Sequence, residues 1–223
     1  MIGEMMAVLL GLPQSHWDAY AFQNSTGCVR LSASQRGLLA QGARQEAAEL
    51  AQRKREQFGE RLLTDVLAAH GLSVQDMPPT QWGTKIPFAY FEEPSSVYLN
   101  RDLAQACQNL LEQTGFAGIF GGIPVEEVLL AHELYHFCAG QGEAPYARQE
   151  HLRLWKLGPF EARRRISALE ELGAMAFAEE YCSLGCSPFV LDVPLTYCCS
   201  PEQAQKLYDR ILGLRQIIEE ESP

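Results

Sequence analysis

Residues 124–140 read PVEEVLLAHELYHFCAG. Pro124 suits the first turn of a helix, because its fixed φ is helical and its missing N–H has no partner there anyway. Apolar residues then recur at helical spacing up to about Cys138, and Gly140 is a natural end. We therefore predict a helix here that is largely buried.

Two histidines lie one helical turn apart within this stretch. Residues 132–136 read HELYH, so His132 and His136 occupy positions i and i+4 on one face. Such a pair can bind one tetrahedral Zn²⁺ at about 2.0–2.1 Å. Glu133 lies beside them, where it can accept a proton from the attacking water without being a ligand. We predict zinc at His132 and His136 with Glu133 as general base. The alternative is that both histidines are ordinary core residues whose hydrogen bonds are satisfied without a metal.

A catalytic zinc site needs a third protein ligand. We expect a second long helix over residues 161–184, which contains several acidic residues. Glu171 shares a helix face with the small residue Ala178, which lets two helices approach closely, whereas Glu170 shares its face with the bulky Phe177. This register predicts Glu171 as the third ligand. The acidic candidates on this helix are Glu170, Glu171, Glu179 and Glu180.

Residues 128–136, VLLAHELYH, resemble the signature of the ImmA/IrrE family of zinc-dependent peptidases. The resemblance covers about residues 40–190 and includes the order of long helix, hairpin and motif helix. It implies a zinc metallopeptidase with Glu171 as third ligand, whose substrate is a helix-turn-helix repressor or an antitoxin-like protein. The second family motif, a Glu followed by Ala, Asn and a Phe-Ala pair, corresponds to Glu171, Ala174, Met175, Phe177 and Ala178, with methionine in place of the asparagine.

The remaining elements predict an α+β fold, which is a mostly helical zincin-like domain with a small antiparallel sheet flanking the active-site helix. Asn100 is expected to cap a helix, and the strand 96–100 is our candidate for the sheet edge that pairs with an extended substrate. The other expected elements are a helix over 34–71 divided at Gly59, a turn-rich segment 75–79, a hairpin of strands 86–91 and 96–100, a helix 101–113, a polar loop 141–158, a loop marked by Pro188 and Pro194, and a helix 201–218.

The length of 223 residues suits one domain with appendages. We divide the chain into an irregular N-terminal segment 1–33, a zincin-like metallopeptidase domain 34–190, and a C-terminal loop and helix 191–223.

Composition excludes several classes of partner. The formal charge of −10 disfavours direct binding to nucleic acid, and the basic clusters 53–55 and 163–165 are interpreted as solvated helix faces. No apolar stretch reaches the roughly 18 residues of a membrane span. The seven cysteines, an odd number without a signal peptide, indicate reduced thiols in a cytoplasm.

Three weaker candidates could contact substrate or stabilise an oxyanion, namely Tyr146, His151 and Tyr181. The cysteines Cys182, Cys186, Cys198 and Cys199 could form a second metal site or could simply be buried thiols. Met175 and these cysteines also suggest a different class of function, a non-catalytic zinc-binding regulatory module with a zincin fold. The two functions differ in whether the metal keeps an open coordination position or is closed by a fourth protein ligand.

Overall fold

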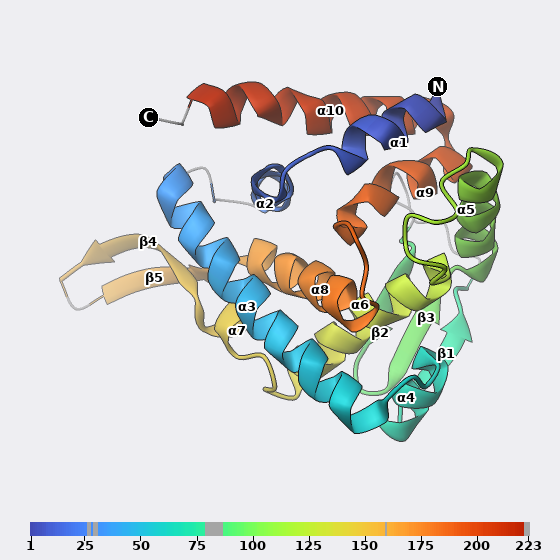
Figure 1. Ribbon diagram of the computed structural model, residues 1–223. Helices are drawn as coiled ribbons and strands as arrows, with labels where there is room; N and C mark the ends of the chain where they lie inside the picture. The colour runs from blue at the N-terminus through green and yellow to red at the C-terminus, as the bar shows by residue number, and fades with distance from the viewer. Residues whose placement is uncertain (26–27, 29–30, 79–86, 159, 221–223) are drawn as a thin grey trace.

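The computed structural model describes residues 1–25, 28, 31–78, 87–158 and 160–220, without the side chains of 215–220. In these residues the chain has a mostly helical α+β fold with two small sheets, which confirms the predicted fold class. Figure 1 shows the helices grouped around the centre and one hairpin that extends away from them. The elements are α1 (Ile2–Leu10), α2 (Gln14–Gln23), α3 (Ala33–Phe58), α4 (Leu63–Ala69), β1 (Ser73–Asp76), β2 (Ala89–Glu92), β3 (Ser96–Leu99), α5 (Arg101–Gln113), α6 (Val125–Gly140), α7 (Tyr146–Gln149), β4 (His151–Leu157), β5 (Phe160–Arg165), α8 (Ser167–Tyr181), the 3₁₀ helix η2 (Pro188–Leu191), α9 (Asp192–Cys199) and α10 (Pro201–Glu220).

Helix α8 packs against both α3 and α6 (Figure 1). Two glycines allow a close approach between helices, one between α8 and α6 and one between α3 and α7. A Cβ atom on Gly173 of α8 would lie 2.1 Å from the Tyr135 hydroxyl of α6, and one on Gly42 of α3 would lie 2.4 Å from the Tyr146 ring. Both distances are far inside van der Waals contact, so neither position has room for a side chain. The tight packing sets the distance between the helices that carry the predicted ligands.

The larger sheet has the strand order β1-β3-β2. The predicted hairpin is confirmed where it is described, because β2 and β3 pair antiparallel with Phe91 opposite Val97; Ile86, the expected first residue, lies outside the described residues. Strand β1 was not predicted, since residues 75–79 were interpreted as turn-rich. It pairs parallel with β3 and makes the sheet mixed. Only one of its four side chains is even partly buried, so its sequence carries little alternation of apolar and polar residues.

The predictions for residues 141–166 were wrong. The expected polar loop 141–158 contains α7 and β4, and the helix expected to start at residue 161 is preceded by β5 and begins at Ser167. Strand β5 reads FEARRR, whose Glu, Ala and Arg residues favour a helix locally. Pairing with β4 overrides that weak preference. The basic cluster 163–165 therefore lies on a strand and not on a helix face.

The described part of segment 1–33 is also not irregular, because it contains α1 and α2. Both helices pack against C-terminal elements. Trp17 stacks on Phe189 of η2 with ring centroids 6.0 Å apart, and buried His16 contacts the carbonyl of Ile211 at 2.6 Å. The loop expected around Pro188 and Pro194 is instead η2 followed by α9. Buried residues from both ends of the chain thus belong to the same hydrophobic core as the central segment.

Other local predictions are confirmed. Helix α3 ends at Phe58 because Gly59, with φ of +64°, leaves the helical conformation, and α4 continues the predicted helical region. The Asn100 side chain accepts a hydrogen bond of 3.0 Å from the backbone N–H of Leu103 and caps α5. Among the residues that the structure describes, none of the helices combines the length and apolar character that crossing a membrane requires.

Candidate metal centre

Helix α6 presents His132 and His136 on one face, as the spacing predicts. Pro124 is the N-cap residue of α6, and Glu126 and Glu127 in the first turn interact favourably with the helix dipole. The two Nε2 atoms lie 3.0 Å apart. Neither imidazole can satisfy the other unless a proton or a cation lies between their lone pairs.

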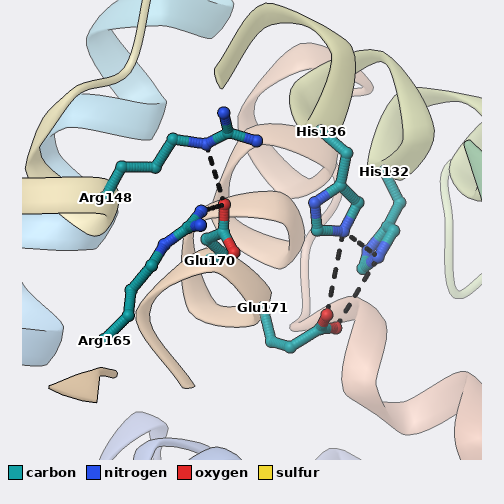
Figure 2. A network of polar contacts seen from close by, with 6 residues as sticks. All are labelled: His132, His136, Arg148, Arg165, Glu170 and Glu171. Atoms are coloured by element: carbon teal, nitrogen blue, oxygen red, sulfur yellow. Dashed lines mark hydrogen bonds and ion pairs between the residues drawn. The ribbon is translucent and has the colours of Figure 1, made fainter. Parts of the chain in front are cut away.

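Helix α8 brings Glu171 to these histidines. Its carboxylate oxygens lie 3.7 Å from Nε2 of His132 and 3.8 Å from Nε2 of His136. The neighbouring Glu170 points elsewhere and forms ion pairs with Arg148 and Arg165 (Figure 2). Adjacent residues of a helix project about 100° apart, so only one of these two glutamates can face the histidines.

The three donor groups fit a single metal ion. Their ligand atoms all lie within 4.8 Å of one another. Ligands held about 2.0–2.1 Å from a tetrahedral Zn²⁺ are roughly 3.3 Å apart, close to the separations of 3.0, 3.7 and 3.8 Å in this group. Two imidazole nitrogens and one carboxylate could therefore hold a metal ion after small side-chain adjustments.

Burial keeps both histidines in the form that binds metals. Desolvation lowers the pKa of His132 to about 4. The pKa of His136 is also lowered to about 4, chiefly by desolvation and further by the charges of His132 and Arg148, while Glu171 and Glu170 oppose the shift. Both rings are consequently neutral near pH 7, and their nitrogen lone pairs are available.

Glu133 is buried beside the donor group, with 5% of its surface exposed. Desolvation raises its pKa to about 8, the charge of Glu171 raises it further, and a backbone hydrogen bond from Phe91 opposes the shift. Desolvation in the cavity also raises the pKa of Glu171, although about half of that side chain remains exposed. A cation bound to Glu171 would offset the mutual repulsion of the two carboxylates.

A cavity of about 1200 Å³ opens in front of the donor group. His132, Glu133 and Glu171 form part of its wall. Much of the remaining lining is apolar and comes from several elements, with Leu129 of α6 and Phe189 of η2 among the contributors. The arrangement combines titratable groups with an apolar cavity large enough for several side chains of a ligand.

The strand next to this cavity is β2 and not β3. We expected residues 96–100 to be the sheet edge that receives a substrate, but β3 lies between β1 and β2 and has partners on both sides. Ala89 and Tyr90 of β2 line the cavity. The unpredicted strand β1 is the reason for this correction, because its pairing moves β3 from the edge to the centre.

The structure adds three polar residues that the sequence did not indicate. The Tyr20 hydroxyl donates a hydrogen bond of 2.8 Å to Asp192, and the guanidinium of Arg210 lies 5.9 Å from the centre of the Tyr20 ring. All three line the cavity. Desolvation is the largest cause that raises the pKa of Asp192 to about 6, and the charge of Glu171 adds to it. They come from α2, α9 and α10, and no motif links such distant segments.

Tyr146, His151 and Tyr181 are not brought to the cavity. Tyr146 packs over Gly42, and its backbone N–H donates to Glu46. His151 is exposed at the start of β4 and contacts the carbonyl of Gln149. Tyr181 stacks on Phe177 with ring centroids 5.5 Å apart. These contacts position helices and the hairpin base.

The cysteines are not part of the donor group. All seven thiols are free. Among the described residues, the group of side chains that could hold a metal ion contains His132, His136 and Glu171 and no cysteine. Cys182 and Cys186 follow α8, whereas Cys198 and Cys199 end α9. The structure therefore offers no assembled second metal site in the described part of the chain.

Comparison of the chain with protein-family models, with curated proteins and with solved structures returned no match.

Proposed function

We propose that this protein is a zinc-dependent metallopeptidase that hydrolyses peptide bonds of a protein substrate. The observation that carries the proposal is the convergence of His132, His136 and Glu171 on one point. Two of these residues, His132 and Glu171, line the cavity together with the general-base candidate Glu133. Two histidines and a carboxylate form a ligand set used by zinc peptidases. When bound, Zn²⁺ supplies Lewis acidity that polarises a carbonyl and makes water a stronger acid.

Residues of the chain itself would carry out proton transfer and bind the substrate. Glu133 accepts a proton from the attacking water and returns it to the leaving amine, and its raised pKa of about 8 makes it a sufficiently strong base for the first transfer. A bound cation would lower that pKa, so Glu133 would be ionised near neutral pH. The edge of β2 can pair with an extended substrate beside the cavity.

The alternative is a non-catalytic zinc-binding regulatory module. A purely structural zinc site is closed by four protein ligands, whereas a catalytic site has three and leaves one position open. Among the described residues, three donors converge here and no cysteine joins them. A buried carboxylate at Glu133 also has no use in a structural site, and its burial is costly. Both observations favour the enzyme.

We also propose, on the resemblance of residues 128–136 to the ImmA/IrrE signature, that the substrate is a helix-turn-helix repressor or an antitoxin-like protein. We further propose a cytoplasmic location, which is consistent with the seven free thiols.

The proposal is tested with zinc-loaded protein, a library of unstructured peptides and mass spectrometry of the products. We expect cleavage by the wild type and a loss of roughly 10²–10⁴-fold in Glu133→Gln, because glutamine cannot accept the proton. The zinc content and circular dichroism of the variant should be unchanged. Equal cleavage by Glu133→Gln would exclude Glu133 as the base, and a zinc-loaded wild type that cleaves no peptide would support the regulatory module instead.

A further inference from the structure

The β4–β5 hairpin has two chemically different faces. Residues that pair across an antiparallel ladder lie on the same face, and successive pairs alternate between faces. On this basis one face is charged and the other is largely apolar. The charged face carries the pairs His151–Arg165, Arg153–Arg163 and Lys156–Glu161, and the apolar face carries Leu152–Arg164, Trp155–Ala162 and Leu157–Phe160.

The apolar face is uncovered near the tip of the hairpin. Trp155, Leu157 and Phe160 are 54%, 75% and 70% exposed. Figure 1 shows that this part of the hairpin extends away from the helices. Large apolar side chains that gather on a surface mark interaction sites, and tryptophan is among the residues that dominate binding energy.

The charged face has more basic than acidic side chains. It carries four Lys or Arg side chains and one acidic side chain, Glu161, in a chain whose formal charge is −10. Arg165 is paired with Glu170 and Arg163 with Glu161. Arg153 lies directly opposite Arg163, and like charges in such a pair repel.

Three basic side chains of the hairpin have no ion pair in the described part of the chain, namely Arg153, Lys156 and Arg164. An anionic partner would relieve the repulsion and supply the missing counter-charges.

One edge of the hairpin is regular. The ladder has a register shift between Arg153 and Trp155 of β4, whereas the pairing positions of β5 run without a break. A bulge disrupts the outward-facing edge of the strand that contains it. Among the described residues, neither strand pairs with a third strand. The edge of β5 is therefore the one that can receive an added strand.

We propose that the β4–β5 hairpin is a docking site for a partner protein, which adds an extended segment along β5. Acidic side chains of that segment extend the charged face beside β5, where the long side chains of Arg153 and Lys156 can reach them from β4. The alternating apolar side chains extend the apolar face next to Phe160. The partner is thus recognised by a short sequence in which acidic and apolar residues alternate. This surface lies outside the cavity, and its docking function does not require hydrolysis.

Charge favours a protein segment over duplex DNA or an anionic membrane. Both of these are extended polyanions, and they would reach beyond the hairpin to the rest of the chain, which is more acidic than the molecule as a whole. A short segment contacts only the basic β4–β5 hairpin. The base of the hairpin is linked to α8, because Arg165 of β5 contacts Glu170, the residue before Glu171; Arg148 of α7 contacts the same carboxylate (Figure 2).

The test uses a fluorescein-labelled peptide in which glutamate alternates with valine and phenylalanine, titrated with the full chain carrying Glu133→Gln so that no cleavage intervenes. Fluorescence anisotropy should show saturable binding that weakens as salt is added. In the same background, Arg153→Gln/Lys156→Gln should weaken binding about tenfold. The matched control Arg53→Gln/Arg61→Gln removes two exposed basic charges outside the hairpin and should leave binding unchanged within about twofold.

Two further variants separate the apolar face and the strand edge. Trp155→Ser/Phe160→Ser should reduce binding at least about tenfold. A probe with N-methyl groups on alternate amides keeps its side chains but cannot form the ladder, and its binding should fall similarly. Unchanged zinc content and circular dichroism show that each variant is folded.

The proposal is overturned if the Glu133→Gln chain binds no probe at about millimolar concentration, or if Arg153→Gln/Lys156→Gln or the N-methylated probe binds as well as its reference. It is equally overturned if a 16-base-pair duplex or vesicles of phosphatidylglycerol bind the hairpin while the peptide does not. None of these results depends on hydrolysis, so failure of the docking site and failure of the proposed peptidase are distinguishable.

Discussion

The α6–α8 helix pair and the β4–β5 hairpin are neighbours along the chain, but their charged residues lie in opposite environments. On the helices, Glu133 is buried, and desolvation shifts His132 and His136 strongly towards their neutral forms. On the hairpin, Arg153 and Lys156 are exposed and unpaired within the described residues. Titratable groups held close together in a low-dielectric site indicate a catalytic or metal-binding site. Unpaired charges on a hairpin that extends from the molecule indicate a surface that binds a partner.

One residue joins the two environments. Glu170 belongs to α8 and lies next to Glu171, yet it pairs with Arg165 of β5 and Arg148 of α7 (Figure 2). The difference between two adjacent glutamates therefore comes from the direction in which each leaves the helix.

The largest effect is expected for loss of a histidine ligand. His132→Ala should reduce the zinc content from about one per chain to nearly none after dialysis against a chelator, because two donors remain where a stable site needs at least three. Inductively coupled plasma mass spectrometry measures the metal. His151→Ala, at the exposed base of the hairpin, is the matched control and should retain zinc. Stoichiometric zinc in His132→Ala would place the metal elsewhere.

Adjacent glutamates provide the second comparison. Glu171→Gln should weaken zinc binding at least about 100-fold, since an outer-shell group alone contributes 10–100-fold and a ligand contributes more. Glu170→Gln removes ion pairs to the hairpin and should change zinc affinity by less than about tenfold. Competition with a chromophoric chelator measures both constants. The reverse order of the two effects would show that the helix register is wrong.

Close packing between α3 and α7 is tested at Gly42. Gly42→Ala should lower the free energy of unfolding by about 1–3 kcal/mol, because the new methyl group overlaps the Tyr146 ring. Gly37→Ala on the same helix has nothing within 4 Å of its new Cβ and should raise stability by about 0.5–1 kcal/mol through helix propensity. Urea denaturation measures both changes. Equal effects at the two glycines would contradict the close approach.

The smallest effect is expected on the hairpin. Arg153→Gln removes one member of the like-charged pair with Arg163 and should raise the free energy of unfolding by less than about 0.5 kcal/mol. Thermal unfolding at low salt is the measurement, and the gain should disappear as salt screens the repulsion. A loss above about 1 kcal/mol would mean that Arg153 stabilises the fold through a contact we have not recognised.

The sequence alone determined the features that depend on local spacing. The helical period placed His132 and His136 on one face. Asn100 predicted the N-terminal cap of α5, and Gly59 marked the end of α3. The geometry of a helix follows from its hydrogen bonds, so residues three or four apart have known relative positions. The same rule favoured Glu171 over Glu170, and the structure directs Glu171 to the histidines.

Tertiary structure decided what depends on contacts between distant segments. Strand β5 has a helix-favouring sequence and became a strand by pairing with β4, and the added strand β1 moved β3 from the sheet edge to its centre. Tyr20, Asp192 and Arg210 meet at the cavity from three separate helices. Local propensity amounts to a few tenths of a kcal/mol per residue, and burial and strand pairing contribute more. These partners are far apart in the chain, so only the folded molecule brings them together.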